Sequence, residues 1–185
     1  MSPREQLLTL LANRSARRGS FTLASGRQSS LYIDARLTTM SPDGLALIGP
    51  LGLAAMHDAG WRPDAVGGLT LGADPVSYAI AYASALAGAP VRAFTVRKEA
   101  KQHGTGRLIE GPYQEGDAVV VIEDVITTGG SALRAVEALR QAGATVIGVL
   151  AVVDREEGGR EAIEAAGLAV QTLARASDIV QRMPA

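Results

Sequence analysis

The sequence contains no cysteine among its 185 residues, so disulfide bonds and thiolate metal sites are excluded. A chain without cysteine is typical of a reducing compartment, and we expect a cytoplasmic protein. It also lacks a run of the roughly 18 apolar residues that a membrane-spanning helix needs, and its first residues lack the apolar stretch of a signal peptide. We therefore expect no membrane partner.

An excess of charge of one sign is also missing, because the formal net charge is −1. Proteins that bind nucleic acid usually carry a broad basic face, so we expect no nucleic-acid partner and only local anion binding. Hydrophobic residues make up 47% and charged residues 20%, which is typical of a folded domain and argues against disorder. The length fits a single domain of residues 1–185.

Apolar segments of strand length alternate with segments of helical periodicity along most of the chain. The predicted strands cover residues 65–69, 91–96, 118–122, 146–153 and 168–173, and the predicted helices cover residues 4–13, 42 to about 60, 74–86, 131–141 and 160–166. The second helix contains Gly49-Pro50, where we expect a break or a bend. Residues 21–34 are predicted to be extended around a turn at Ser25-Gly26. The alternation predicts an α/β fold with a parallel sheet covered on both faces.

The most informative pattern is the segment from residue 119 to residue 131, VVVIEDVITTGGS. Its β-branched residues predict a buried strand, and Glu123 and Asp124 follow at the sheet edge where ligands bind. Two threonines, Gly129-Gly130 and Ser131 then lead into a helix, whose free N–H groups and dipole suit a phosphate. The carboxylates suit ribose hydroxyls or a hard cation. The glycines alone would fit an ordinary turn, but the whole pattern predicts a sugar phosphate site.

A second candidate segment, residues 97–115, lacks the apolar spacing of a core element. Its first eleven positions carry five basic side chains, Arg97, Lys98, Lys101, His103 and Arg107. A charged run is often only a solvated surface. This one concentrates the positive charge of a nearly neutral protein directly after a strand, and long loops inside compact domains are usually functional.

A third candidate, Arg155, follows the predicted strand at residues 146–153. It could form an exposed ion pair with Glu156 or Glu157, which would contribute little. Alternatively, it could bind a planar anion through two parallel hydrogen bonds. The two histidines lie in different settings, so no histidine metal site is expected, and Trp61 is interpreted as a packing residue.

With these residues in view, the chain resembles the type I phosphoribosyltransferases. Their signature segment is similar to Val119 to Ala132 at almost every position. Residues 97–106, RKEAKQHGTG, resemble the mobile catalytic loop of the orotate-specific members, and residues 21–27, FTLASGR, resemble their N-terminal segment. Asp154-Arg155 matches the position of their orotate-contacting arginine.

The resemblance implies a parallel-sheet, Rossmann-like core with a small N-terminal hood, at about residues 1–40, and a mobile catalytic loop at residues 97–115. It implies magnesium-dependent transfer of a phosphoribosyl group from phosphoribosyl diphosphate to orotate, a step of pyrimidine synthesis. The family works as a homodimer whose active sites are shared across subunits, and the metal is implied to arrive on the diphosphate, with no direct protein ligand.

Residue roles follow from the same resemblance. The implied catalytic residues are Lys101, His103 and Asp124. The implied phosphoribosyl diphosphate ligands are Arg97, Lys98, Lys101, His103, Glu123, Asp124, Val125, Ile126, Thr127, Thr128, Gly129, Gly130 and Ser131. Thr127 and Arg155 are implied to bind orotate.

The chain departs from some members, which have a lysine where Ala24 stands here and another near Leu71. The diphosphate pocket is then expected to hold fewer cations, for which Arg27 could compensate, and residues 70–75 could bind diphosphate through backbone amides. Two alternatives stay open. A regulator with this fold would bind nucleotide or RNA without needing a basic catalytic loop, and a purine transferase would not need Arg155.

Overall fold

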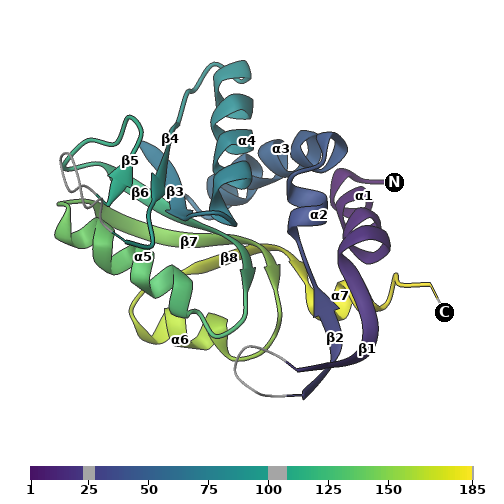
Figure 1. The fold of residues 1–185 in the computed structure, drawn as a ribbon. Helices are drawn as coiled ribbons and strands as arrows, with labels where there is room; N and C mark the ends of the chain where they lie inside the picture. The colour runs from purple at the N-terminus through teal and green to yellow at the C-terminus, as the bar shows by residue number, and fades with distance from the viewer. Residues whose placement is uncertain (23–27, 100–107, 185) are drawn as a thin grey trace.

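The computed structural model describes residues 1–22, 28–99 and 108–184, and it confirms the predicted α/β fold (Figure 1). Six strands form the main sheet in the order β5-β4-β3-β6-β7-β8. Their bounds are β3 Ala65–Leu69, β4 Arg92–Val96, β5 Ile109–Glu110, β6 Ala118–Ile126, β7 Thr145–Asp154 and β8 Val170–Arg175. All pairings are parallel except that of β5 with β4.

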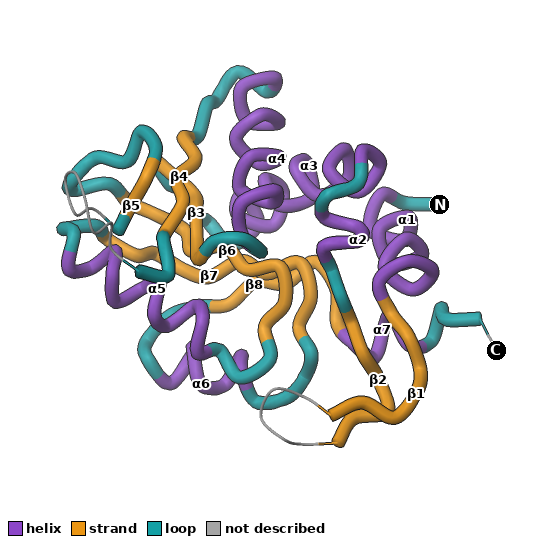
Figure 2. Tube along the Cα trace, in the orientation of Figure 1, coloured by secondary structure: helices purple, strands orange, loops and turns teal. Residues whose placement is uncertain are grey.

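Helices cover both faces of this sheet, as Figure 2 shows. On one face lie α3 and α4, with α1 beside α3, and on the other lie α5 and α6. The helix bounds are α1 Pro3–Leu10, α2 Arg36–Thr39, α3 Pro42–Asp58, α4 Ala73–Leu86, α5 Gly130–Gln141, α6 Gly159–Ala165 and α7 Ala176–Val180, and a π-helical turn covers Leu11–Ser15. Among the described residues, no helix combines the length and the apolarity needed to cross a bilayer.

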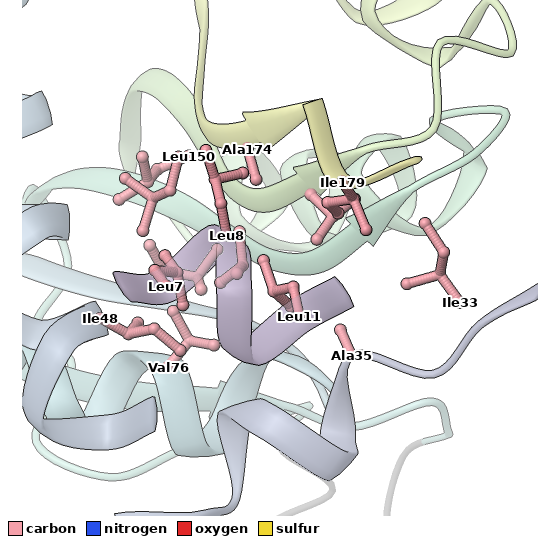
Figure 3. Packing of buried hydrophobic residues seen from close by; sticks show 14 of the residues in the cluster. Leu7, Leu8, Leu11, Ile33, Ala35, Ile48, Val76, Leu150, Ala174 and Ile179 are labelled. Atoms are coloured by element: carbon pink, nitrogen blue, oxygen red, sulfur yellow. The ribbon is translucent and has the colours of Figure 1, made fainter. Parts of the chain in front are cut away.

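The N-terminal part forms a small antiparallel hairpin beside the sheet, the expected hood. Strands β1 (Ala16–Thr22) and β2 (Gln28–Ile33) pair with each other and not with the main sheet. The hairpin follows α1 and the π-helical turn, which Figure 3 shows packed into the core through Leu7 and Leu8 of α1 and Leu11 of the turn, close to Ile48. Because these leucines are fully buried, α1 ties the hood to the sheet.

Two predicted boundaries need correction. Strand β6 does not end at Ile122 but continues through both acids to Ile126, because Val125 and Ile126 still pair with Val153 and Asp154 of β7. Helix α3 also runs without the expected break at Gly49-Pro50. A Cβ on Gly49 would lie 2.5 Å from the carbonyl oxygen of Ala79, so this glycine allows α3 to pack closely on α4.

Candidate functional site

A cavity of about 410 Å³ lies beyond the carboxyl ends of β3, β4, β6 and β7, where parallel sheets bind ligands. The hood closes it from another side through the segment that follows β2. The lining residues include residues 32–36, residues 69–72, Lys98, residues 123–125, Thr127, Ser131, Arg134 and Arg155. The fold thus gathers charged side chains from five parts of the chain at one edge of the sheet.

The floor of the cavity includes the turn between β6 and α5. Gly129 has a φ of 80°, in the left-handed region that favours glycine, and a Cβ there would lie 2.8 Å from the Gly159 carbonyl oxygen. Thr127 and Thr128 are exposed, and no side chain caps the first N–H groups of α5. A helix start with uncapped N–H groups is suited to a phosphate.

Glu123 stands inside this edge as a buried carboxyl group. Its side chain is 7% exposed, and its Oε1 has no hydrogen-bond partner. Burial, and to a smaller extent the charge of Asp124, raise the pKa of Glu123 to about 8, although Arg134 acts in the opposite direction. A buried carboxyl group with such an oxygen is suited to bind a hydroxyl group or a cation.

Asp124, on the opposite face of the strand, is only partly buried and points into the cavity. Its Oδ1 accepts a hydrogen bond from the N–H of Val125 at 2.8 Å. Burial raises the pKa of Asp124, while the Val125 hydrogen bond and the nearby Arg36 oppose the shift. A Cβ on Gly72 would lie 2.5 Å from Oδ1, so only glycine at position 72 leaves room for this carboxylate.

The pKa of Glu123 makes a prediction about stability. Because the folded-state value lies above the ordinary value of 4.5, its contribution is present below pH 4.5 and is lost as the pH rises through about 8. Glu123→Gln is therefore expected to raise the free energy of unfolding by on the order of 3 kcal/mol at pH 9 and to change it little at pH 4. Urea unfolding at both pH values measures this.

The matched control is Glu137→Gln, which removes the same charge from an exposed position of α5. It is expected to leave the pH dependence unchanged. A Glu123→Gln variant whose gain is the same at pH 4 and pH 9 would contradict the buried, proton-holding carboxyl.

Arg155 lines the cavity immediately after β7. Its Nη2 donates to the Leu31 carbonyl oxygen at 3.0 Å and lies 2.8 Å from Oε1 of Glu157. The pairing with Glu157 agrees with one alternative considered from the sequence, but the pair is buried, with side chains 5% and 16% exposed. The Nε of Arg155 is also buried, and it has no hydrogen-bond partner among the described residues.

Comparisons with known proteins identify the family. Residues 52–171 match the phosphoribosyl transferase domain. An orotate phosphoribosyltransferase of Aquifex aeolicus (strain VF5) is 48% identical, over 97% of this chain and 99% of the relative. The orotate phosphoribosyltransferase of Mycobacterium tuberculosis H37Rv, in complex with 5-phospho-α-D-ribosyl 1-diphosphate, superposes with a TM-score of 0.82 and is 43% identical, over 97% of this chain and 99% of that one. This chain belongs to the orotate phosphoribosyltransferase family. The resemblance seen in the sequence is confirmed.

Several residues that the family resemblance implicates do line the cavity. They are Lys98, Glu123, Asp124, Val125, Thr127, Ser131 and Arg155. Ile126 is buried in the core at 1% exposure, so it could reach a ligand only through its backbone. Arg97 lies beside the cavity, with Nη1 3.8 Å from Glu110. Lys101, His103, Ala24, Arg27 and Arg107 lie outside the described residues.

Of the segment of residues 70–75, residues 70–72 join β3 to α4, and the rest already belongs to the first turn of α4. Residues 70–72 line the cavity, and the peptide between Thr70 and Leu71 is cis. Asp74 accepts hydrogen bonds from Thr70 at 2.7 Å and from Thr95 at 2.8 Å. These bonds tie the start of α4 to the loop and to β4 beside the cavity, and binding of diphosphate by the loop's backbone amides stays a prediction.

Sequence reasoning did not select two cavity-lining arginines, Arg36 and Arg134. Arg36 pairs with Asp34 through Nε at 2.8 Å and Nη2 at 3.0 Å. Arg134 was expected to face outwards, and it is exposed at the rim of the cavity. Arg36 is the first residue of α2 and Arg134 lies one turn into α5, and neither position is marked by a pattern that predicts a binding site. Trp61 packs on Gly148, as predicted.

Proposed function

We propose that this enzyme transfers the phosphoribosyl group of phosphoribosyl diphosphate to orotate, giving orotidine 5′-monophosphate and diphosphate in pyrimidine synthesis. The observation that carries the proposal is a single cavity with three complementary parts. Uncapped N–H groups of α5 suit the 5-phosphate, Glu123 and Asp124 suit the ribose diol, and Arg155 suits the carboxylate of orotate. The Mycobacterium relative forms a complex with the same phosphoribosyl donor, which supports phosphoribosyl diphosphate as the donor substrate.

The positions of these parts support an order along the cavity. The 5-phosphate lies on the turn of Thr127 to Ser131, and the diol lies on the two carboxyl groups of β6. Because Arg155 follows the neighbouring strand β7, the base binds beside the ribose on that side. Lys98 follows β4, on the other side of β3, so the diphosphate extends in that direction towards Arg97 and residues 70–72.

The residue types suit the chemistry of this transfer. The bond from C1 to the diphosphate breaks early, so positive charge develops on the ribose and negative charge on the leaving group. The Asp124 carboxylate beneath the ribose and cations around the diphosphate stabilise these charges more in the transition state than in the ground state. Lys101 and His103, as catalytic residues, supply further positive charge. Orotate attacks through its own ring nitrogen, so no serine or cysteine nucleophile is needed.

Magnesium fits the proposal as an ion carried by the diphosphate. Among the described residues, no three histidine, aspartate or glutamate side chains are grouped to hold a metal by themselves. Glu123 and Asp124 are oxygen donors of the kind that magnesium prefers, and Oε1 of Glu123 lacks a partner. When bound, the ion neutralises part of the diphosphate charge, while the two carboxyl groups hold the ribose.

We also propose that the cytoplasmic protein is a homodimer of single-domain subunits that share their active sites. An apolar face on α3 and α4 supports this, because Tyr78, Tyr82 and Leu86 are 55%, 70% and 73% exposed. Apolar patches of this kind mark protein interfaces. The α4 end of this face adjoins residues 70–72 of the cavity, so a second copy there could deliver Lys101 and His103 of its own catalytic loop.

The test is an ultraviolet assay with phosphoribosyl diphosphate and magnesium, using either orotate or a purine base as the acceptor. Loss of the orotate absorbance, with no reaction of the purine, is expected. Reaction of the purine would favour the rival transferase. Binding of the donor without any reaction would favour a regulator that keeps the fold.

Arg36 is expected to bind the diphosphate, since it lines the cavity and is half exposed. Arg36→Ala should raise the KM for phosphoribosyl diphosphate about tenfold, a typical loss for one charged hydrogen bond, with little change in the KM for orotate. The control is Arg14→Ala, which breaks a similar exposed arginine–aspartate pair with Asp43, away from the cavity. Equal KM values in the two variants would remove Arg36 from the site.

A further inference from the structure

A carboxylate of the protein itself lies against the arginine assigned to the substrate carboxylate. Oε1 of Glu157 is 2.8 Å from Nη2 of Arg155, and both side chains are nearly buried. The same Nη2 donates to the Leu31 carbonyl oxygen at 3.0 Å. One nitrogen of the guanidinium therefore serves two protein oxygens before any substrate binds.

Because of the shape of the guanidinium, Nη2 takes part whenever a carboxylate binds through two parallel hydrogen bonds. A carboxylate can bind through two parallel hydrogen bonds along only two edges of the group, one formed by Nε and Nη2 and the other by Nη1 and Nη2. Both edges include Nη2. A substrate carboxylate that binds in this way must bring an oxygen to the nitrogen beside which Glu157 already lies.

Two carboxylates around one buried nitrogen repel each other, because charges interact strongly where water is excluded. The Leu31 oxygen belongs to the backbone of β2 and is held by the hairpin pairing, whereas Glu157 is a side chain. The edge formed by Nε and Nη2 is the one with an unsatisfied donor, since the buried Nε has no hydrogen-bond partner among the described residues. Glu157 is therefore the group that has to move away from Nη2 when the substrate carboxylate binds.

The backbone on either side of Glu157 is held in place. A movement of the Glu157 side chain is therefore the change that would free Nη2 of Arg155 for the substrate carboxylate. The carboxylate of Glu156 accepts hydrogen bonds from the N–H of Ser177 at 2.8 Å and from its hydroxyl at 3.1 Å. Glu156 has a φ of 57° and Gly158 a φ of 90°, so the turn has a defined form.

We propose that Glu157 is a specificity-determining residue that competes with the acceptor's carboxylate for Arg155. This inference rests on the proposed function, because it takes Arg155 as the group that binds orotate. In the free enzyme Glu157 neutralises Arg155 and takes the place of the substrate carboxylate. It thereby limits the affinity for orotate and leaves the affinity for an uncharged pyrimidine unchanged.

The test compares Glu157→Gln with the wild type at saturating phosphoribosyl diphosphate and magnesium. Glutamine keeps the size of the side chain and removes its charge. The KM for orotate is expected to fall about tenfold. The Ki of uracil, the same ring without the carboxylate, is expected to stay within about twofold when uracil competes with orotate. Glu161→Gln, an exposed position on α6, is the control and should change neither value.

Each outcome has one meaning. A higher KM for orotate in Glu157→Gln would show that Glu157 supports Arg155 and would overturn the inference. Equal changes for orotate and uracil would show a displaced loop and would also overturn it. Absence of orotate turnover in the wild type would instead refute the proposed function, so the two failures are distinguishable.

Discussion

Arg155→Ala is expected to raise the KM for orotate by about 30-fold to 1000-fold, which corresponds to roughly 2–4 kcal/mol for a buried charge pair. The side chain is nearly buried in the cavity wall, so water cannot replace the lost guanidinium. The KM for phosphoribosyl diphosphate should change little, because the proposed places of the 5-phosphate and the diol are on β6 and its following turn. Steady-state kinetics with each substrate varied in turn measure both values.

The control for Arg155→Ala tests the effect of losing the salt bridge between Arg155 and Glu157. Glu157 would lose its salt bridge to Arg155, and breaking a buried pair is costly, so the variant could lose stability for that reason alone. The double variant Arg155→Ala, Glu157→Gln removes both charges and is expected to recover stability without recovering orotate binding. An unchanged KM for orotate in either variant would remove Arg155 from the acceptor site.

Lys101→Ala and Asp124→Ala are each expected to lower kcat by at least about 100-fold, the usual cost of losing one charge-stabilising group. Because the proposed site takes Asp124 from one subunit and Lys101 from the other, a mixed dimer contains one intact site. Equal mixing of the two variants, followed by subunit exchange, should restore about a quarter of wild-type activity, since half the dimers are mixed and each has one working site.

Two controls accompany the mixing experiment. Each variant incubated alone under the same conditions should stay inactive, and a mixture kept below the exchange time should show no recovery. No recovery after complete exchange would contradict the sharing of sites between subunits, while leaving the assignment of Asp124 to the ribose untouched.

Much of the fold followed from local sequence patterns. The predicted strand at residues 65–69 matches β3 residue for residue, because its segment is short, apolar and bounded by helices. The start of α3 was also visible, since Ser41 caps it and accepts a hydrogen bond from the Gly44 N–H. The small elements α2, α7 and β5 were missed, because segments of two to five residues are too short to show a period.

The end of β6 shows why a strand boundary could not be placed by composition. Acidic residues at positions 123 and 124 suggested that the strand had ended, yet pairing with β7 carries it on to Ile126. This extension is what buries Glu123 and raises its pKa to about 8. The type of site was predicted from the residues, but the protonation of its carboxyl groups depends on pairing with the neighbouring strand.

Long-range contacts explain the remaining differences at the site. Arg36 enters the cavity because the hood returns over the sheet, which no local pattern in residues 34–36 indicates. Arg155 reaches Leu31, 124 positions earlier in the chain, by a single hydrogen bond. Pairing with Glu157 had been considered only as an exposed contact of small effect. Because the pair is nearly buried, we expect it to influence the affinity of the enzyme for the acceptor.

The central claim, that a ribosyl phosphate binds where β6 passes into α5, is tested most directly by a crystal structure with phosphoribosyl diphosphate and magnesium. We predict electron density for the 5-phosphate within hydrogen-bond distance of the backbone N–H groups of residues 127–131, and for the ribose hydroxyls beside Glu123 and Asp124. Density for the donor at another place on the protein, with this turn unoccupied at saturating concentration, would contradict the account.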